Sequence, residues 1–116
     1  SALAIAKDLH PIAEYKLRDI AQSPLENKYD LLLCTEVLEH LPDPVKGVKN
    51  ILDSSGPNAK ILLTVPDGRI DTYEGHINFW SIESWEAFLC SHVNRKNIKT
   101  GYLKDEQILF GLLTLD

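Results

Sequence analysis

The chain has 116 residues, of which 44% are hydrophobic and 25% charged, a balance typical of a folded globular domain and not of a disordered or fibrous protein. Its formal net charge of −5, without runs of Lys or Arg, argues against binding to nucleic acid or to an anionic membrane surface. We find neither an apolar stretch near the ~20 residues that cross a bilayer nor a signal segment, so we expect a cytoplasmic protein.

The first 28 residues predict one helix and one short strand. Apolar residues recur at helical spacing over residues 2–9, with Pro11 just beyond, so we expect an amphipathic helix there. The stretch 14–17 alternates polar and apolar side chains and predicts a strand. A polar loop that contains Ser23 and Pro24 then leads to the next element.

Two apolar strands and a helix follow. Residues 29–34 and 60–65 are nearly continuous apolar runs, typical of parallel strands that helices cover on both faces. Between them Asp43 can cap a helix, Pro44 suits its first turn, and Gly56 is expected to end it. A strand, a helix and a strand at this spacing predict a right-handed crossover between parallel strands.

The C-terminal third predicts a helix and a pair of strands. Ser81 can cap a helix that carries Trp85, and Trp80 is placed to pack on Trp85 as a hydrophobic staple. The stretches 97–103 and 107–115 look like strands. Because so short a turn separates them, they must be antiparallel.

The most informative segment is YDLLLCTEVLEHLPDP, residues 29–44, in which an apolar strand runs into a carboxylate-rich turn. Ligands of open parallel sheets bind beyond the carboxyl ends of the strands. Together with GPNAKILLTVPD, residues 56–67, this segment resembles the class I (Rossmann-like) S-adenosylmethionine-dependent methyltransferases, close to the ubiquinone-biosynthesis O-methyltransferases of the type 11 group. The resemblance implies an α/β fold, the C-terminal part of a Rossmann-like methyltransferase: a mostly parallel sheet with an antiparallel C-terminal strand pair and flanking helices.

The resemblance also implies a missing segment. In these enzymes an acidic residue and a Gly-x-Gly turn after the first strand grip the cofactor, and the sequence contains no Gly-x-Gly. We therefore expect residues 1–116 to be a single, truncated methyltransferase-like domain that is inactive by itself. Such a piece should expose the edge of the strand over 29–34, so we expect a homo-oligomer or a partner chain at that edge.

Five residues match the family's cofactor contacts. By resemblance, Asp19 and Ile20 contact the adenine, and Cys34, Thr35 and Glu36 lie near the methionine part of S-adenosylmethionine. A carboxylate can accept from the adenine amino group, and an apolar side chain can cover the ring. Asp19 could equally form an Asx-turn, and Ile20 could belong to the core.

Glu36, Glu39 and His40 are spaced i, i+3 and i+4. On a helical turn they would share one face and could bind a single ion, and two carboxylates with an imidazole suit Mg²⁺, Mn²⁺ or Fe²⁺. The plant small-RNA 2′-O-methyltransferases carry a similar Glu-x-x-Glu-His motif and a later His, which by resemblance makes His76 a further ligand. The alternative is that the carboxylates interact with a helix dipole while His40 is a packed residue or a general base.

These features predict transfer of a methyl group from S-adenosylmethionine to an oxygen, or less readily a nitrogen, of a small molecule. His40 and His76 are the predicted catalytic residues, and His40 or a metal would handle the proton. Two alternatives stay open: a non-catalytic assembly module that pairs its strand edges, and a divalent-metal-binding protein without methyl transfer. We expect no nucleic-acid or membrane partner.

Overall fold

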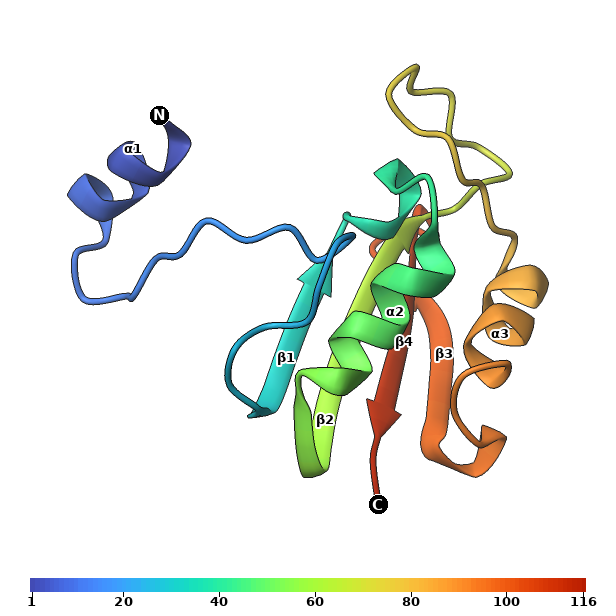
Figure 1. Ribbon diagram of the computed structural model, residues 1–116. Coiled ribbons are helices and arrows are strands. Elements are labelled where there is room, and N and C mark those ends of the chain that lie inside the picture. Colours follow the sequence, from blue (N-terminus) through green and yellow to red (C-terminus); the bar gives the residue numbers. More distant parts are fainter.

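A four-stranded sheet forms the body of the protein. The computed structural model describes residues 1–116 (Figure 1), with α1 (Ala2–Leu9), β1 (Tyr29–Thr35), η1 (Leu38–His40), α2 (Pro44–Asp53), β2 (Ser55–Pro66), α3 (Ile82–Cys90), η2 (Arg95–Asn97), β3 (Ile98–Leu103) and β4 (Ile108–Thr114), where η marks a short 3-10 helix. The strand order is β1-β2-β4-β3. Only β1 and β2 pair in parallel; the other two pairs are antiparallel. The α/β class and the partial Rossmann-like arrangement are confirmed, with a smaller parallel part than predicted.

Helices α2 and α3 cover the same face of the sheet (Figure 1). Alternate residues of β2 and β4 point toward this face and form one buried core with Val48 and Ile51 of α2 and with Trp85 and Leu89 of α3. Burial of each such side chain contributes about 1.5–3 kcal/mol. The strand residues of this core are Ile61, Leu63, Val65, Leu109 and Leu113.

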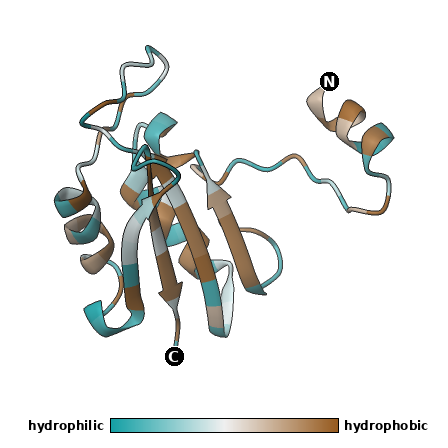
Figure 2. Cartoon of the chain, turned by 180° about the vertical axis from the view of Figure 1, so that it is seen from behind, coloured by the Kyte–Doolittle hydropathy of each residue, from teal (hydrophilic) through white to brown (hydrophobic).

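No helix covers the opposite face, which Figure 2 shows from behind. Leu31 and Leu33 of β1 lie on this face and are 63% and 66% exposed. The pairing register places three half-buried side chains of β2 and β4 on the same face, those of Leu62, Phe110 and Leu112. β1 pairs only with β2, so its other edge is free. The free edge matches the prediction, whereas the expectation that helices cover both faces of this strand is wrong.

The N-terminal segment lies apart from the sheet (Figure 1). The predicted helix over 2–9 is confirmed as α1, and the Ser1 side chain caps it by accepting from the Ala4 N–H, but none of its residues is buried. The strand predicted over 14–17 is wrong: residues 14–17 form no regular element, and Leu17 is 79% exposed. A strand needs a hydrogen-bonded neighbour, and this segment does not pair with the free edge of β1.

The predicted helix starts are confirmed, but one predicted stop is wrong. Asp43 caps α2 by accepting from the Lys46 N–H. Ser54 ends that helix, with its N–H and its hydroxyl both donating to the Asn50 carbonyl, whereas Gly56 already belongs to β2. None of the helices has the length and apolar character that crossing a membrane requires.

The start of α3 agrees with the sequence in detail. Ser81 forms a reciprocal capping box with Ser84. The Trp80 and Trp85 rings are in edge-to-face contact with centroids 5.4 Å apart, as the predicted hydrophobic staple requires. This contact fixes where the loop between β2 and α3 returns to the core.

Candidate functional site

The chain leaves β1 through a residue in the left-handed region. Glu36 has a φ of 58°, its N–H donates to the carbonyl of Thr64 over 3.0 Å, and its carboxylate accepts from the Thr64 hydroxyl over 3.3 Å. η1 begins only at Leu38. Glu36 therefore does not share a helical turn with Glu39 and His40, contrary to the prediction, because the turn back from β1 uses a conformation that no helix contains.

Glu39 is a buried carboxylate without hydrogen bonds. Its side chain is 1% exposed, and neither carboxylate oxygen has a partner. Burial is the largest influence and raises the pKa of Glu39, and the nearby charge of Glu36 adds to it, whereas the backbone amide of Glu39 and the two histidines, His40 and His76, act in the opposite direction. A buried carboxylate is destabilising unless it binds a cation or a proton, which makes Glu39 a candidate functional residue.

Two histidines face this carboxylate. The Nε2 atoms of His40 and His76 lie 3.8 and 3.9 Å from Glu39 Oε2, too far for a hydrogen bond. The two rings meet edge to face with centroids 4.6 Å apart. One ligand atom from each of the three residues lies within 4.8 Å of the others, so the structure brings together Glu39, His40 and His76, but not Glu36.

The other ring nitrogen of each histidine is already bonded. His40 Nδ1 lies 3.1 Å from the carbonyl oxygen of Gly75, and His76 Nδ1 lies 2.5 Å from Asp71 Oδ2. A carbonyl and a carboxylate only accept, so both Nδ1 atoms carry the proton of a neutral ring. Both Nε2 lone pairs are then free on the side of Glu39.

Asn78 holds the loop that carries His76 against η1. Its side-chain amide donates to the carbonyls of Leu38 and Leu41, and the N–H groups of Ile77 and Asn78 donate to the carbonyl of Glu39. The residue pattern around Asn78 does not indicate this bonding. The sequence likewise does not indicate Asp71, whose five-residue separation from His76 belongs to no recognisable motif.

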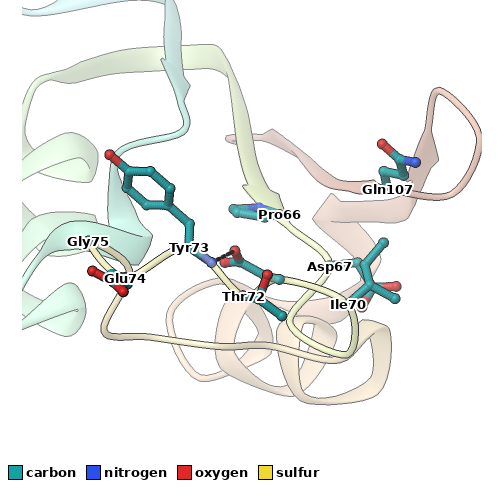
Figure 3. Close-up of a pocket in the computed structure, with 9 residues that line it drawn as sticks. Pro66, Asp67, Ile70, Thr72, Tyr73, Glu74, Gly75 and Gln107 are labelled. Carbon is teal, nitrogen blue, oxygen red and sulfur yellow. Dashed lines mark hydrogen bonds between the residues drawn. The ribbon is translucent and has the colours of Figure 1, made fainter.

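An open cavity of about 950 Å³ lies beside this loop, at the carboxyl end of β2 (Figure 3). Tyr73 and Glu74 border it on one side, and Gln107 lies across from them. Asp67 and Asp71 add two more carboxylates to its wall. Since Asp71 also bonds His76, the cavity adjoins the cluster of Glu39, His40 and His76.

The predicted cofactor residues are only partly gathered. Ile20, Cys34 and Thr35 line one mostly apolar groove of about 330 Å³, together with Val37 and with Ile51 of α2. Asp19 and Glu36 are not part of its lining. The Asp19 carboxylate accepts from the Ala21 N–H over 3.0 Å, which is the Asx-turn that we considered as its alternative.

Comparisons with known proteins agree with this fold. Residues 5–100 match the family described as "Methyltransferase domain". A search of the curated proteins found no match. The N-methyltransferase NodS from Bradyrhizobium japonicum WM9, solved with S-adenosyl-L-homocysteine, superposes with a TM-score of 0.71 at 17% identity, over 98% of this chain and 61% of that chain.

Two further solved structures are similar. TehB from Haemophilus influenzae gives a TM-score of 0.67 at 13% identity, over 98% of this chain and 45% of that one. A chain of the Pnkp1/Rnl/Hen1 RNA repair complex gives 0.63 at 18% identity, over 97% and 28%. This chain thus spans less than two thirds of each of these three solved chains. Since the family match covers most of the sequence, the chain belongs to the methyltransferase-domain family, with part of the class I S-adenosylmethionine-dependent methyltransferase fold.

Proposed function

We propose that the chain takes part in the transfer of a methyl group from S-adenosylmethionine to an oxygen of a small molecule. Family membership supports methyl transfer, and the complex of NodS with S-adenosyl-L-homocysteine supports this cofactor. The observation that carries the choice of oxygen is Glu39, a buried carboxylate that two imidazole Nε2 atoms face. A hydroxyl must lose its proton as its oxygen attacks the methyl carbon, and these groups can accept that proton.

His40 and His76 have different parts in this proposal. His40 is 45% exposed and can reach an acceptor hydroxyl, whereas His76 is 14% exposed and lies between Glu39 and Asp71. The cavity wall with Tyr73 and Glu74 offers the acceptor hydrogen-bond partners next to them. The contribution of these residues is to orient the acceptor and to take its proton.

The same cluster can hold a divalent ion if its side chains move slightly closer together. Three ligand atoms that are evenly spaced about 2.1 Å from one ion lie about 3.6 Å apart. The Nε2 atoms of His40 and His76 lie 3.8 and 3.9 Å from Glu39 Oε2, and the three ligand atoms lie within 4.8 Å of one another. Two imidazoles and one carboxylate suit Mn²⁺ better than Mg²⁺, which prefers oxygen ligands. An ion held by Glu39, His40 and His76 would polarise the acceptor oxygen. Glu36, whose carboxylate accepts from the Thr64 hydroxyl, lies outside this group of ligand atoms.

Titration with Mn²⁺ and Mg²⁺ by calorimetry tests the ion. The protein freed of metal with a chelator should bind Mn²⁺ more tightly than Mg²⁺, and Glu39→Gln should abolish binding because it removes the only carboxylate of the cluster. Glu74→Gln is the matched control, since it removes one exposed carboxylate from the neighbouring loop. Equal Mn²⁺ binding by the parent and Glu39→Gln would eliminate the ion from the proposal.

The groove of Ile20, Cys34 and Thr35 supports only part of a cofactor site. Its apolar wall can cover the face of an adenine ring, but it has no glycine-rich turn to bind the charged end of the cofactor. We therefore expect weak binding of S-adenosyl-L-homocysteine, and no turnover, by this chain alone. Tight binding in calorimetry would contradict this expectation, whereas Mn²⁺ binding without any cofactor binding would favour a metal-binding protein.

A second candidate function is a non-catalytic assembly module. It is favoured by the free edge of β1, where Leu31 and Leu33 are exposed on the uncovered face. Such an edge can pair with the same edge of a second copy. Light scattering after size exclusion should then show a dimer that Leu33→Lys dissociates, while Leu17→Lys, at an exposed leucine outside the sheet, leaves it intact. A monomeric parent would remove this candidate.

A further inference from the structure

Asp71 uses both of its carboxylate oxygens within its own loop. Oδ1 accepts from the N–H of Tyr73 over 3.1 Å, and Oδ2 lies 2.5 Å from Nδ1 of His76. The side chain is only 7% exposed although the loop borders an open cavity. Its own N–H donates to the carbonyl of Asp67 over 3.0 Å, so the residue is tied to the end of β2. Asp71 is therefore held firmly beside the histidine.

The bond to Asp71 decides what His76 presents to Glu39. A neutral imidazole carries one proton, and the nitrogen without it is the one that can accept a proton or bind an ion. A carboxylate at Nδ1 stabilises the tautomer with the proton there, which leaves a lone pair on Nε2. This Nε2 lies 3.9 Å from Glu39 Oε2. With the opposite tautomer, an N–H would point at the cluster.

His40 has the same Nδ1–H tautomer, but a backbone group and not a side chain accepts its hydrogen bond. Its Nδ1 donates to the backbone carbonyl of Gly75, which no side-chain substitution removes. The two histidines thus form an internal comparison: a side chain orients one, and the backbone orients the other. Tyr73 packs on the His76 ring with centroids 4.7 Å apart and limits its rotation.

We propose that Asp71 is a positioning residue that fixes the Nδ1–H tautomer of His76 and thereby turns a free Nε2 toward Glu39. The inference rests on the proposed function of the cluster of Glu39, His40 and His76 for its chemical purpose, but the tautomer itself does not depend on that function. Asp71 does not touch the acceptor in this proposal; it acts through His76.

The test is nitrogen-15 NMR of the histidine rings in the metal-free protein at a pH at which they are neutral. His76→Gln and His40→Gln assign the signals. In the parent, both rings should be Nδ1–H tautomers. In Asp71→Asn, whose amide can donate as well as accept, His76 should shift toward the Nε2–H tautomer while His40 stays unchanged. Glu74→Gln, with the same loss of charge in the same loop, should alter neither ring.

Calorimetry with Mn²⁺ supplies the second readout. Asp71→Asn should weaken Mn²⁺ binding by about 10- to 100-fold, the usual effect of losing a partner that orients a ligand, and Asp71→Glu should recover part of it. If the parent binds no Mn²⁺, the ion of the proposed function fails, and the NMR experiment still decides the role of Asp71. An Nε2–H tautomer of His76 in the parent overturns the inference, even if no variant folds. An unchanged His76 tautomer in folded Asp71→Asn overturns it as well.

Discussion

The side-chain amide of Asn78 donates a hydrogen bond of 2.6 Å to the backbone carbonyl of Leu41. This bond, with its companion to the carbonyl of Leu38, ties the loop after β2 to the turn after β1. The two segments are 37 residues apart in the chain, yet their contact brings His76 to Glu39. The geometry of the cluster therefore depends on a residue that has no part in its chemistry.

Replacing Asn78 with Ala should cost stability and open the cluster. The Leu41 carbonyl loses the donor of its side-chain bond, which typically costs about 1–3 kcal/mol, whereas the Leu38 carbonyl keeps its bond from the Leu41 N–H. Urea unfolding should show this loss, and Mn²⁺ binding should weaken because His76 is no longer held near Glu39. Asn27→Ala is the control, since Asn27 is exposed and its side chain makes no hydrogen bond within the protein. Equal stability of the two variants would exclude the bracing role of Asn78.

Glu39→Gln should stabilise the metal-free protein at neutral pH. Because burial raises the pKa of Glu39 in the folded state, its contribution to stability is fully present below pH 4.5, the ordinary value, and is lost as the pH rises through the folded-state pKa. Glutamine does not titrate, so the free energy of unfolding of Glu39→Gln, measured with urea, should increasingly exceed that of the parent as the pH rises above 4.5.

Glu83→Gln should change the stability of the protein in the opposite direction from Glu39→Gln. Hydrogen bonding to the backbone at the start of α3, and next the charge of Arg69, lowers the pKa of Glu83. Its contribution is present above pH 4.5 and is lost as the pH falls through the lowered pKa. The variant should therefore be at a disadvantage at neutral pH. The same trend with pH in both variants would contradict the assignment for Glu39.

Gly68 cannot accept a side chain. A Cβ there would lie 2.5 Å from the backbone nitrogen of Trp80 and 2.7 Å from the carbonyl carbon of Phe79. Since backbone must move, Gly68→Ala should cost about 1–3 kcal/mol or more in thermal unfolding. Gly56→Ala, where the nearest atom is 3.5 Å away, should be neutral or slightly stabilising. Similar melting temperatures for the two variants would show that the loop between β2 and α3 can shift to accommodate the added Cβ.

Cys34 should be a slow nucleophile. Burial, and next the charge of Glu39, raises the pKa of its thiol to about 11. At pH 8 its thiolate fraction is then roughly a thousandth, against about a quarter for a free cysteine. Alkylation by iodoacetamide, followed by mass spectrometry, should label Cys34 slowly in the folded protein and at the ordinary rate in urea. Rapid labelling of folded Cys34 at pH 8 would rule out this environment.

The elements that the sequence predicts well are those with local signals. Asp43 and Ser81 cap helices through bonds within one turn, and Trp80 meets Trp85 across the same turn. The pairing of β3 with β4 follows from the short turn between them. Each of these features depends on residues close together in the chain, so pattern and structure agree.

The errors concern contacts between distant residues. The alternation over 14–17 is compatible with a strand, but it has no neighbour to pair with. The spacing of Glu36 and Glu39 is compatible with a helix, but the return from β1 puts Glu36 in the left-handed region. The group that orients His40 is the backbone carbonyl of Gly75. Since every residue carries such a carbonyl, the sequence does not indicate this contact.

The one-sided covering of the sheet has a calorimetric consequence. Unfolding of a typical protein of 116 residues raises the heat capacity by about 1.4–1.7 kcal/mol/K, mostly because newly exposed apolar surface becomes hydrated. Here the face with Leu31, Leu33, Leu62, Phe110 and Leu112 is already in contact with water before unfolding. The increase in heat capacity on unfolding should therefore be smaller for this protein than for a typical one of its length. Its free energy of unfolding should then vary with temperature along an unusually flat curve.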